Sequence, residues 1–131
     1  MSDSVMVWLR DFEACVRSRD FDRGRLLFSQ NIVGFGTVAH ITVGLEQLVN
    51  QQWSHVWNVT RDFEFDYEHM QMDTRDDLTW VATPWASHGF SADGSSYLRA
   101  GRATIVLRRV YDGWVGIHTH FSIRPRDCDA P

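Results

Sequence analysis

Two histidines and a serine occupy alternate positions near the C-terminal end, in the run Trp-Val-Gly-Ile-His-Thr-His-Phe-Ser. Because side chains two residues apart lie on the same face of a β-strand, His118, His120 and Ser122 are predicted to share one face. An Asp-Gly turn joins this strand to a preceding strand that carries Arg102 and Thr104. The hairpin therefore predicts either the wall of a pocket or a polar interface.

The histidine pair has three interpretations. Both side chains could be structural, hydrogen-bonded groups at an interface. An imidazole could instead act as an acid or base, or hydrogen-bond a ligand, because histidine titrates near neutral pH. A His-x-His strand could also bind zinc, but this needs a third protein ligand, for which His40, His69 and His88 are candidates only in principle. We predict no metal and no other cofactor.

Length and composition predict one domain spanning residues 1–131, with 44% hydrophobic and 23% charged residues. The net charge of -4 argues against a nucleic-acid partner. Lysine is absent, which excludes a Schiff-base mechanism. No apolar run approaches ~20 residues and no signal pattern opens the chain, so we expect a cytoplasmic protein without a membrane partner. Cys15 and Cys128 are expected to be reduced thiols.

Helical periodicity dominates the first half of the chain and strand-like alternation dominates the second. We predict three helices: one over residues 5–16, a short one after Asp20, and one over residues 44–58. The segment 31–38 is expected to be a strand or extended, and further strands are expected at 61–72, 78–90, 97–109 and 114–123. This order indicates an α+β, cone-shaped fold, in which three helices pack on the concave face of a strongly curved antiparallel sheet and enclose a cavity.

Four segments of the sequence carry a family resemblance: Val43-Gly-Leu-Glu, the helix with Trp53 and Trp57, Gly101-Arg-Ala-Thr, and Trp114-x-x-Ile-His-x-His-x-Ser. Together they resemble the nuclear transport factor 2-like superfamily, and within it the SnoaL-like branch and the association domain of calcium/calmodulin-dependent protein kinase II. The resemblance implies a cone-shaped fold that forms dimers or higher oligomers through its sheet. It does not fix an activity, because the superfamily includes isomerases, dehydratases, epoxide hydrolases, cyclases, transport factors and assembly domains.

The register of the hairpin decides whether the arginine joins the histidines. A two-residue Asp-Gly loop, which this dipeptide favours, places Arg102 on the face opposite His120. A loop of odd length pairs Arg102 with His120 on one face, and Thr104 with His118. The resemblance to the kinase association domain favours the odd loop. We therefore predict that the side chains of Arg102 and His120 share a sheet face.

On that register the site would hold a small carboxylate. A buried guanidinium needs an anionic partner, which a ligand can supply; the alternative is an ion pair with Asp66 or Glu68. In this hypothesis His120 is the acid or base and His118 supports it. The expected ligand-binding residues are Arg102, Thr104, Trp53, Trp57, Trp85 and Phe35.

Two functions follow from different classes. The first is a small-molecule-binding pocket protein, with or without acid/base turnover of lyase, isomerase or hydrolase type, that takes a small, partly apolar carboxylate. The alternative is a non-catalytic dimerisation or association module, and a homodimer is expected in both cases. Steroid isomerisation is not carried over, because Phe12 stands on the first helix where the related isomerases use a tyrosine.

Overall fold

The helices all precede the long strands of the sheet. The computed structural model describes residues 2–124, so Cys128 lies outside the described residues. The three predicted helical segments are confirmed, and the third contains a π-helical turn between its α-helical parts. The elements are α1 (Ser2–Ser18), α2 (Phe21–Arg25), and a third segment composed of α3 (Leu45–Leu48), η1 (Val49–Trp53), α4 (Ser54–Val56) and η2 (Trp57–Val59).

Seven strands form one sheet. Six follow the order β2-β1-β7-β6-β5-β3, and β4 pairs with another part of β5 than β3 does. The α+β class is confirmed, but the sheet is mixed rather than wholly antiparallel, because β1 runs parallel to β7. A parallel pair requires a crossover in the chain between its strands. The strands are β1 (Phe28–Phe35), β2 (Thr42–Val43), β3 (Thr60–Phe65), β4 (Gln71–Arg75), β5 (Leu78–Phe90), β6 (Ser96–Val110) and β7 (Gly113–Ile123).

The strand predicted over residues 61–72 is in fact two strands, β3 and β4. A turn separates them, in which the Asp66 carboxylate accepts hydrogen bonds from the backbone N–H and the ring of His69. β4 pairs with the first part of β5 and β3 with the last part. Pro84 lies where β5 changes partner, consistent with its lack of an N–H to donate.

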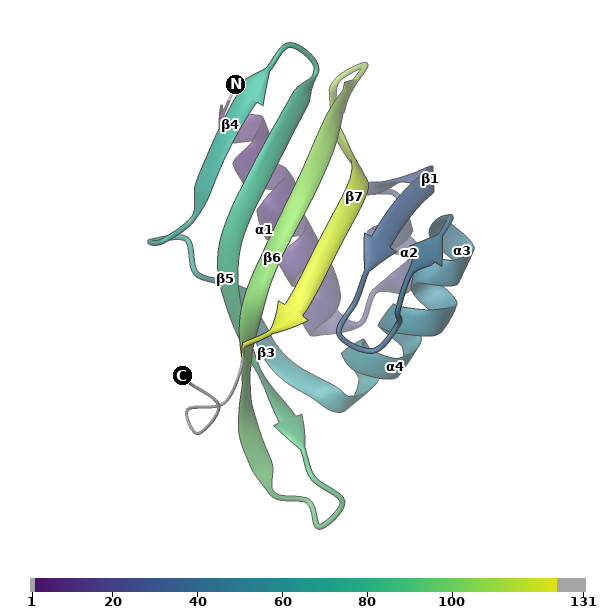
Figure 1. Ribbon diagram of the computed structural model, residues 1–131, viewed down its shortest axis with the longest axis vertical. Coiled ribbons are helices and arrows are strands. Elements are labelled where there is room, and N and C mark those ends of the chain that lie inside the picture. Colours follow the sequence, from purple (N-terminus) through teal and green to yellow (C-terminus); the bar gives the residue numbers. More distant parts are fainter. Residues whose placement is uncertain (1, 125–131) are drawn as a thin grey trace.

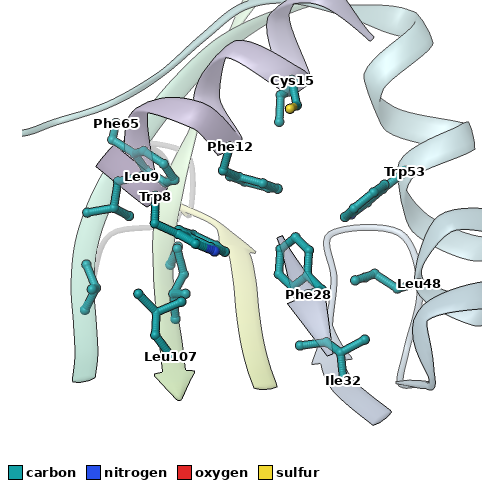
Figure 2. Packing of buried hydrophobic residues seen from close by; sticks show 14 of the residues in the cluster. Trp8, Leu9, Phe12, Cys15, Phe28, Ile32, Leu48, Trp53, Phe65 and Leu107 are labelled. Atoms are coloured by element: carbon teal, nitrogen blue, oxygen red, sulfur yellow. The ribbon is translucent and has the colours of Figure 1, made fainter. Parts of the chain in front are cut away.

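Helix α1 lies across one face of the sheet, and α3 and α4 flank β1 (Figure 1). The core fills the space between α1 and the sheet, where Leu9, Ile105 and Leu107 are fully buried. Figure 2 shows Phe12 of α1 and Phe28 of β1 facing Trp53 of the third helical segment. Within the described residues, no helix combines the length and apolar character that crossing a membrane requires.

The β6–β7 hairpin contains an irregularity that determines which side chains share a face. Val110 pairs with Gly113, so the loop has two residues and not the odd number predicted. Further along, Leu107 pairs with Gly116 whereas its neighbour Val106 pairs with His118. The residue between, Ile117, has no partner on β6 and forms a β-bulge.

The bulge shifts the register by one residue. Beyond it, Thr104 pairs with His120 and Arg102 with Ser122. The prediction that Arg102 and His120 share a face is therefore confirmed, but the predicted cause is wrong, because the shift comes from the bulge and not from the loop.

Candidate functional site

The sheet face that carries the two histidines points away from the helices. On β6 the buried positions are Ala103 and Ile105, so the intervening Thr104 is exposed. On β7 the buried position after the bulge is Thr119, so His120 is exposed as well. The prediction that these residues line the enclosed cavity is wrong.

The physical reason is again the bulge at Ile117. Trp114 and Gly116 are buried before it, and uninterrupted alternation from these positions would direct His118 and His120 inward. The extra residue reverses the alternation and turns both imidazoles outward.

The outward histidines make structural contacts. Nδ1 of His118 lies 2.8 Å from the carbonyl oxygen of Val33 on β1. The ring of Phe35 lies 5.6 Å from the ring of His118 and 5.1 Å from that of His120, edge to face in both cases. The His118 contact corresponds to the structural interpretation of the pair. Among the described residues, no group of three His, Cys, Asp or Glu side chains could hold a metal ion.

Arg102 also lies outside the cavity. The Oγ of Ser122 donates a hydrogen bond of 3.4 Å to the Arg102 carbonyl. Within residues 2–124, the guanidinium forms no ion pair with Asp66 or Glu68, and Asp66 instead contacts His69. The alternative of an ion pair with Asp66 or Glu68 is therefore wrong, and so is the premise of a buried guanidinium, because Arg102 is exposed.

A separate pocket opens between the helices and the concave side of the sheet. The space inside it that the centre of a water molecule can reach is about 50 Å³. Aromatic side chains form much of its wall. Helices contribute Phe12, Trp53 and Trp57, and the sheet contributes Phe28, Phe63, Trp85 and Phe121.

The tryptophan walls predicted from the sequence do line this pocket. The rings of Trp53 and Trp57 stack with centroids 4.3 Å apart and planes 17° apart, as expected for residues one helical turn apart. Trp53 also meets Phe28 at 5.5 Å. Phe35 is at the pocket lining too, but its ring contacts the outward histidines. A planar, apolar ligand suits such walls.

Arg99 supplies the charge of this pocket, although no prediction from the sequence pointed to this residue. Its Nη2 donates to Oγ1 of Thr37 at 2.8 Å, and its Cζ lies 5.4 Å from the centroid of the Trp85 ring. Burial lowers the pKa of the Arg99 guanidinium, which reflects the cost of removing a charge from water. No carboxylate of the described residues lies within ion-pair distance of it.

A signal for Arg99 was present in the sequence. Ala103, Ile105 and Leu107 alternate along β6 as its apolar, inward series. Counting back in steps of two through Gly101 leads to Arg99, and not to Arg102. The buried series on β6 itself identifies the arginine that faces the pocket, whereas the histidines on β7 do not.

Gln52 holds the loop at the mouth of the pocket. Its Oε1 accepts hydrogen bonds from the backbone N–H groups of Val38 and Ala39, at 3.0 and 2.8 Å. Its Nε2 donates to Oγ1 of Thr37 at 2.9 Å, the same oxygen that Arg99 contacts. A Cβ on Gly36 would lie 2.2 Å from this Oε1, so a larger residue there would displace the Gln52 amide. The network connects the loop, the π-helical turn and Arg99.

Arg99 is the sole ionisable side chain among the described residues that line the pocket. No carboxylate, imidazole, thiol or phenol therefore stands ready there for proton transfer. The arrangement can enclose an apolar body and hold one anionic group.

The sequence matches the SnoaL-like domain family over residues 5–125, and the chain belongs to this family. The resemblance predicted from the sequence is thus confirmed. No curated protein matches the chain significantly.

Solved structures of the nuclear transport factor 2-like class share the fold. A superfamily protein from Salmonella enterica has a TM-score of 0.80 and 15% identity, over 95% of this chain and 92% of that one. A ketosteroid isomerase-like protein from Erwinia carotovora atroseptica has a TM-score of 0.78 and 15% identity, over 95% and 96%. The association domain of C. elegans calcium/calmodulin-dependent protein kinase II has a TM-score of 0.70 and 17% identity, over 92% and 93%. Identities this low establish the fold and no activity.

Proposed function

We infer that this SnoaL-like protein binds a small, largely apolar carboxylate in the pocket between its helices and its sheet. The observation that carries the proposal is Arg99, a partly buried guanidinium in an aromatic pocket with no carboxylate partner among the described residues. A desolvated cation is costly unless an anion accompanies it. A ligand carboxylate would accept hydrogen bonds from the guanidinium, and its apolar body would contact Trp53 and Phe28.

The proposed activity is binding and not acid/base turnover. His118 and His120, the predicted catalytic pair, lie on the other side of the sheet from the pocket. Arg99 stays protonated at any physiological pH, so it cannot exchange a proton with a substrate. It can, however, fix the orientation of an anion.

Thermal unfolding with a panel of small acids tests this function. Benzoate, phenylacetate and cyclohexanecarboxylate should raise the melting temperature, since a ligand of the native state stabilises it by RT ln(1 + [L]/Kd). Arg99→Gln should abolish the shift. Arg102→Gln is the matched control, because Arg102 lies on the same strand but faces outward, and it should keep the shift. If no acid stabilises the wild-type protein, the proposal fails.

A second function, self-association through the outer sheet face, is favoured by the apolar side chains exposed there. Trp80 is 45% exposed and Phe35 is 37% exposed. Trp80 pairs with Val106 on β6, which in turn pairs with His118, so the apolar groups and the histidines form a continuous surface. We propose that a second copy covers this surface in a two-fold dimer, with about 1,200–2,000 Å² buried in total.

Light scattering across a dilution series tests the dimer. Trp80→Glu should convert the protein to a monomer, because it places a charge in the proposed contact. Leu26→Glu is the control, since Leu26 is 80% exposed at the end of α2, and it should leave the dimer intact. A wild-type protein that is monomeric at micromolar concentration would contradict the assignment.

A further inference from the structure

Two buried polar groups beside Arg99 have no hydrogen-bond partner among the described residues: the indole Nε1 of Trp85 and the hydroxyl of Ser87. Trp85 is 3% exposed and Ser87 is 2% exposed, and both line the pocket. Buried polar groups of folded proteins are nearly always paired, and each exception has a cost. Two such groups in one pocket indicate that they meet a partner that enters it.

The register of the sheet brings these groups to the guanidinium. Ser87 of β5 pairs directly with Arg99 of β6. Trp85 lies two residues before Ser87, so it shares that face, and its ring lies 5.4 Å from Cζ of Arg99. The three side chains therefore form one cluster on one side of the pocket.

We propose that Trp85 and Ser87 complete the carboxylate site of Arg99 and determine its specificity. This inference rests on the proposed binding function and extends it. The guanidinium and the indole are donors only, and neither can accept a hydrogen bond. A group that only accepts is matched to them, and a ligand that presents an N–H to them is rejected.

Counting donors and acceptors supports a carboxylate in particular. Its two oxygens offer about four lone-pair positions. One N–H of Arg99 is used by Thr37, and the remaining N–H groups can supply two hydrogen bonds in fork geometry. Trp85 supplies a third and Ser87 a fourth. A carboxamide of the same shape would direct its NH₂ group at the donors of Arg99 or Trp85.

The closing experiment compares benzoate with benzamide by titration calorimetry. The wild-type protein should bind benzoate at least about fivefold more tightly, because an unpaired buried donor costs at least that factor. Trp85→Phe and Ser87→Ala should each weaken benzoate binding by about tenfold. Trp85→Phe should also reduce the ratio of the affinity for benzoate to the affinity for benzamide. The matched controls are Trp80→Phe and Ser96→Ala, which alter exposed positions of β5 and β6 and should change neither affinity.

The outcomes distinguish the specificity assignment from the proposed binding of a carboxylate. If Arg99→Gln loses benzoate while Trp85→Phe and Ser87→Ala bind it normally, the specificity assignment is overturned and the binding function stands. If the wild-type protein binds no carboxylate, both are overturned.

The melting temperature of the ligand-free protein distinguishes a binding role of Ser87 from a structural role. Ser87→Ala should melt at the same temperature as the wild type or higher, because it removes a group that has no partner. A marked loss of stability in the ligand-free variant would show that Ser87 supports the fold instead, and would overturn the assignment.

Discussion

Arg99 and Arg102 lie three residues apart on β6, and their side chains are on opposite faces of the sheet. Arg99 lines the aromatic pocket and contacts Thr37, whereas Arg102 is exposed on the outer face opposite Ser122. An odd separation has this effect along any stretch of strand that contains no bulge. The two cations therefore have different physical environments and should respond differently to substitution.

The first prediction concerns the stability of the ligand-free protein. Arg99→Met keeps much of the side-chain length and removes a desolvated charge, so the free energy of unfolding should fall by less than about 1 kcal/mol or should rise. Urea unfolding at equilibrium measures it. Arg102→Met, on the exposed face, should change stability by about 0.5 kcal/mol at most. A large loss in Arg99→Met would mean that the charge already has its partner within the chain.

Gly101 provides the second prediction. A Cβ at this position would lie 1.8 Å from the carbonyl oxygen of Ser122 and 2.7 Å from the ring of Trp85. Because the first clash is with backbone, Gly101→Ala should destabilise the protein by more than about 2 kcal/mol. Gly113→Ala is the control, since nothing lies within 4 Å of its added carbon. The midpoints of urea unfolding compare the two variants, and equal midpoints would refute the argument.

Gln52 provides the third prediction. Gln52→Leu would leave the buried N–H of Ala39 and the N–H of Val38 without their acceptor. An unmade buried hydrogen bond costs about 1–3 kcal/mol, so the loss should be about 2–4 kcal/mol. Gln51→Leu changes the exposed neighbour and should have little effect. Denaturant unfolding measures both, and hydrogen exchange at residues 38 and 39 should accelerate only in Gln52→Leu.

The pH dependence of stability at high pH is the fourth prediction. Burial raises the pKa of Tyr67 to about 12 from an ordinary value of 10.0. The folded state therefore favours the neutral phenol, and this contribution is fully present below pH 10.0 and is lost as the pH rises through about 12. Stability should decline over that interval, and less steeply in Tyr67→Phe. Tyrosinate absorbance should show one tyrosine that titrates near pH 12. If this titration is still present in Tyr67→Phe, Tyr67 is not the group with the raised pKa.

The helices and the long strands could be predicted because their patterns are local. The strand predicted over residues 78–90 matches β5 residue for residue, since its turn residues and its alternation agree. The stripe with Trp53 and Trp57 predicted both a helix and a pocket wall, because one side of a helix must face the sheet. Such patterns depend on neighbours in the sequence and need no knowledge of the partner strand.

The site predicted around His118 and His120 was wrong because the faces of β7 depend on one inserted residue. Ile117 has no feature that marks it as a bulge, yet it decides that Thr119 and not His118 faces the core. Strict alternation along β7 consequently led to the wrong residues. The parallel pairing of β1 with β7 also joins strands from opposite halves of the chain, for which local sequence carries no signal.

The central place of β7 has a consequence for biosynthesis. β7 comes last among the described strands, yet it lies between β1 and β6, and Trp114 donates a hydrogen bond to Ser4 across 110 positions. During translation the helices with their aromatic residues are therefore synthesised well before β7, the strand that completes the sheet over them. Until β7 is made, the apolar residues that it covers stay exposed on the nascent chain, and exposed apolar surface of this kind favours aggregation.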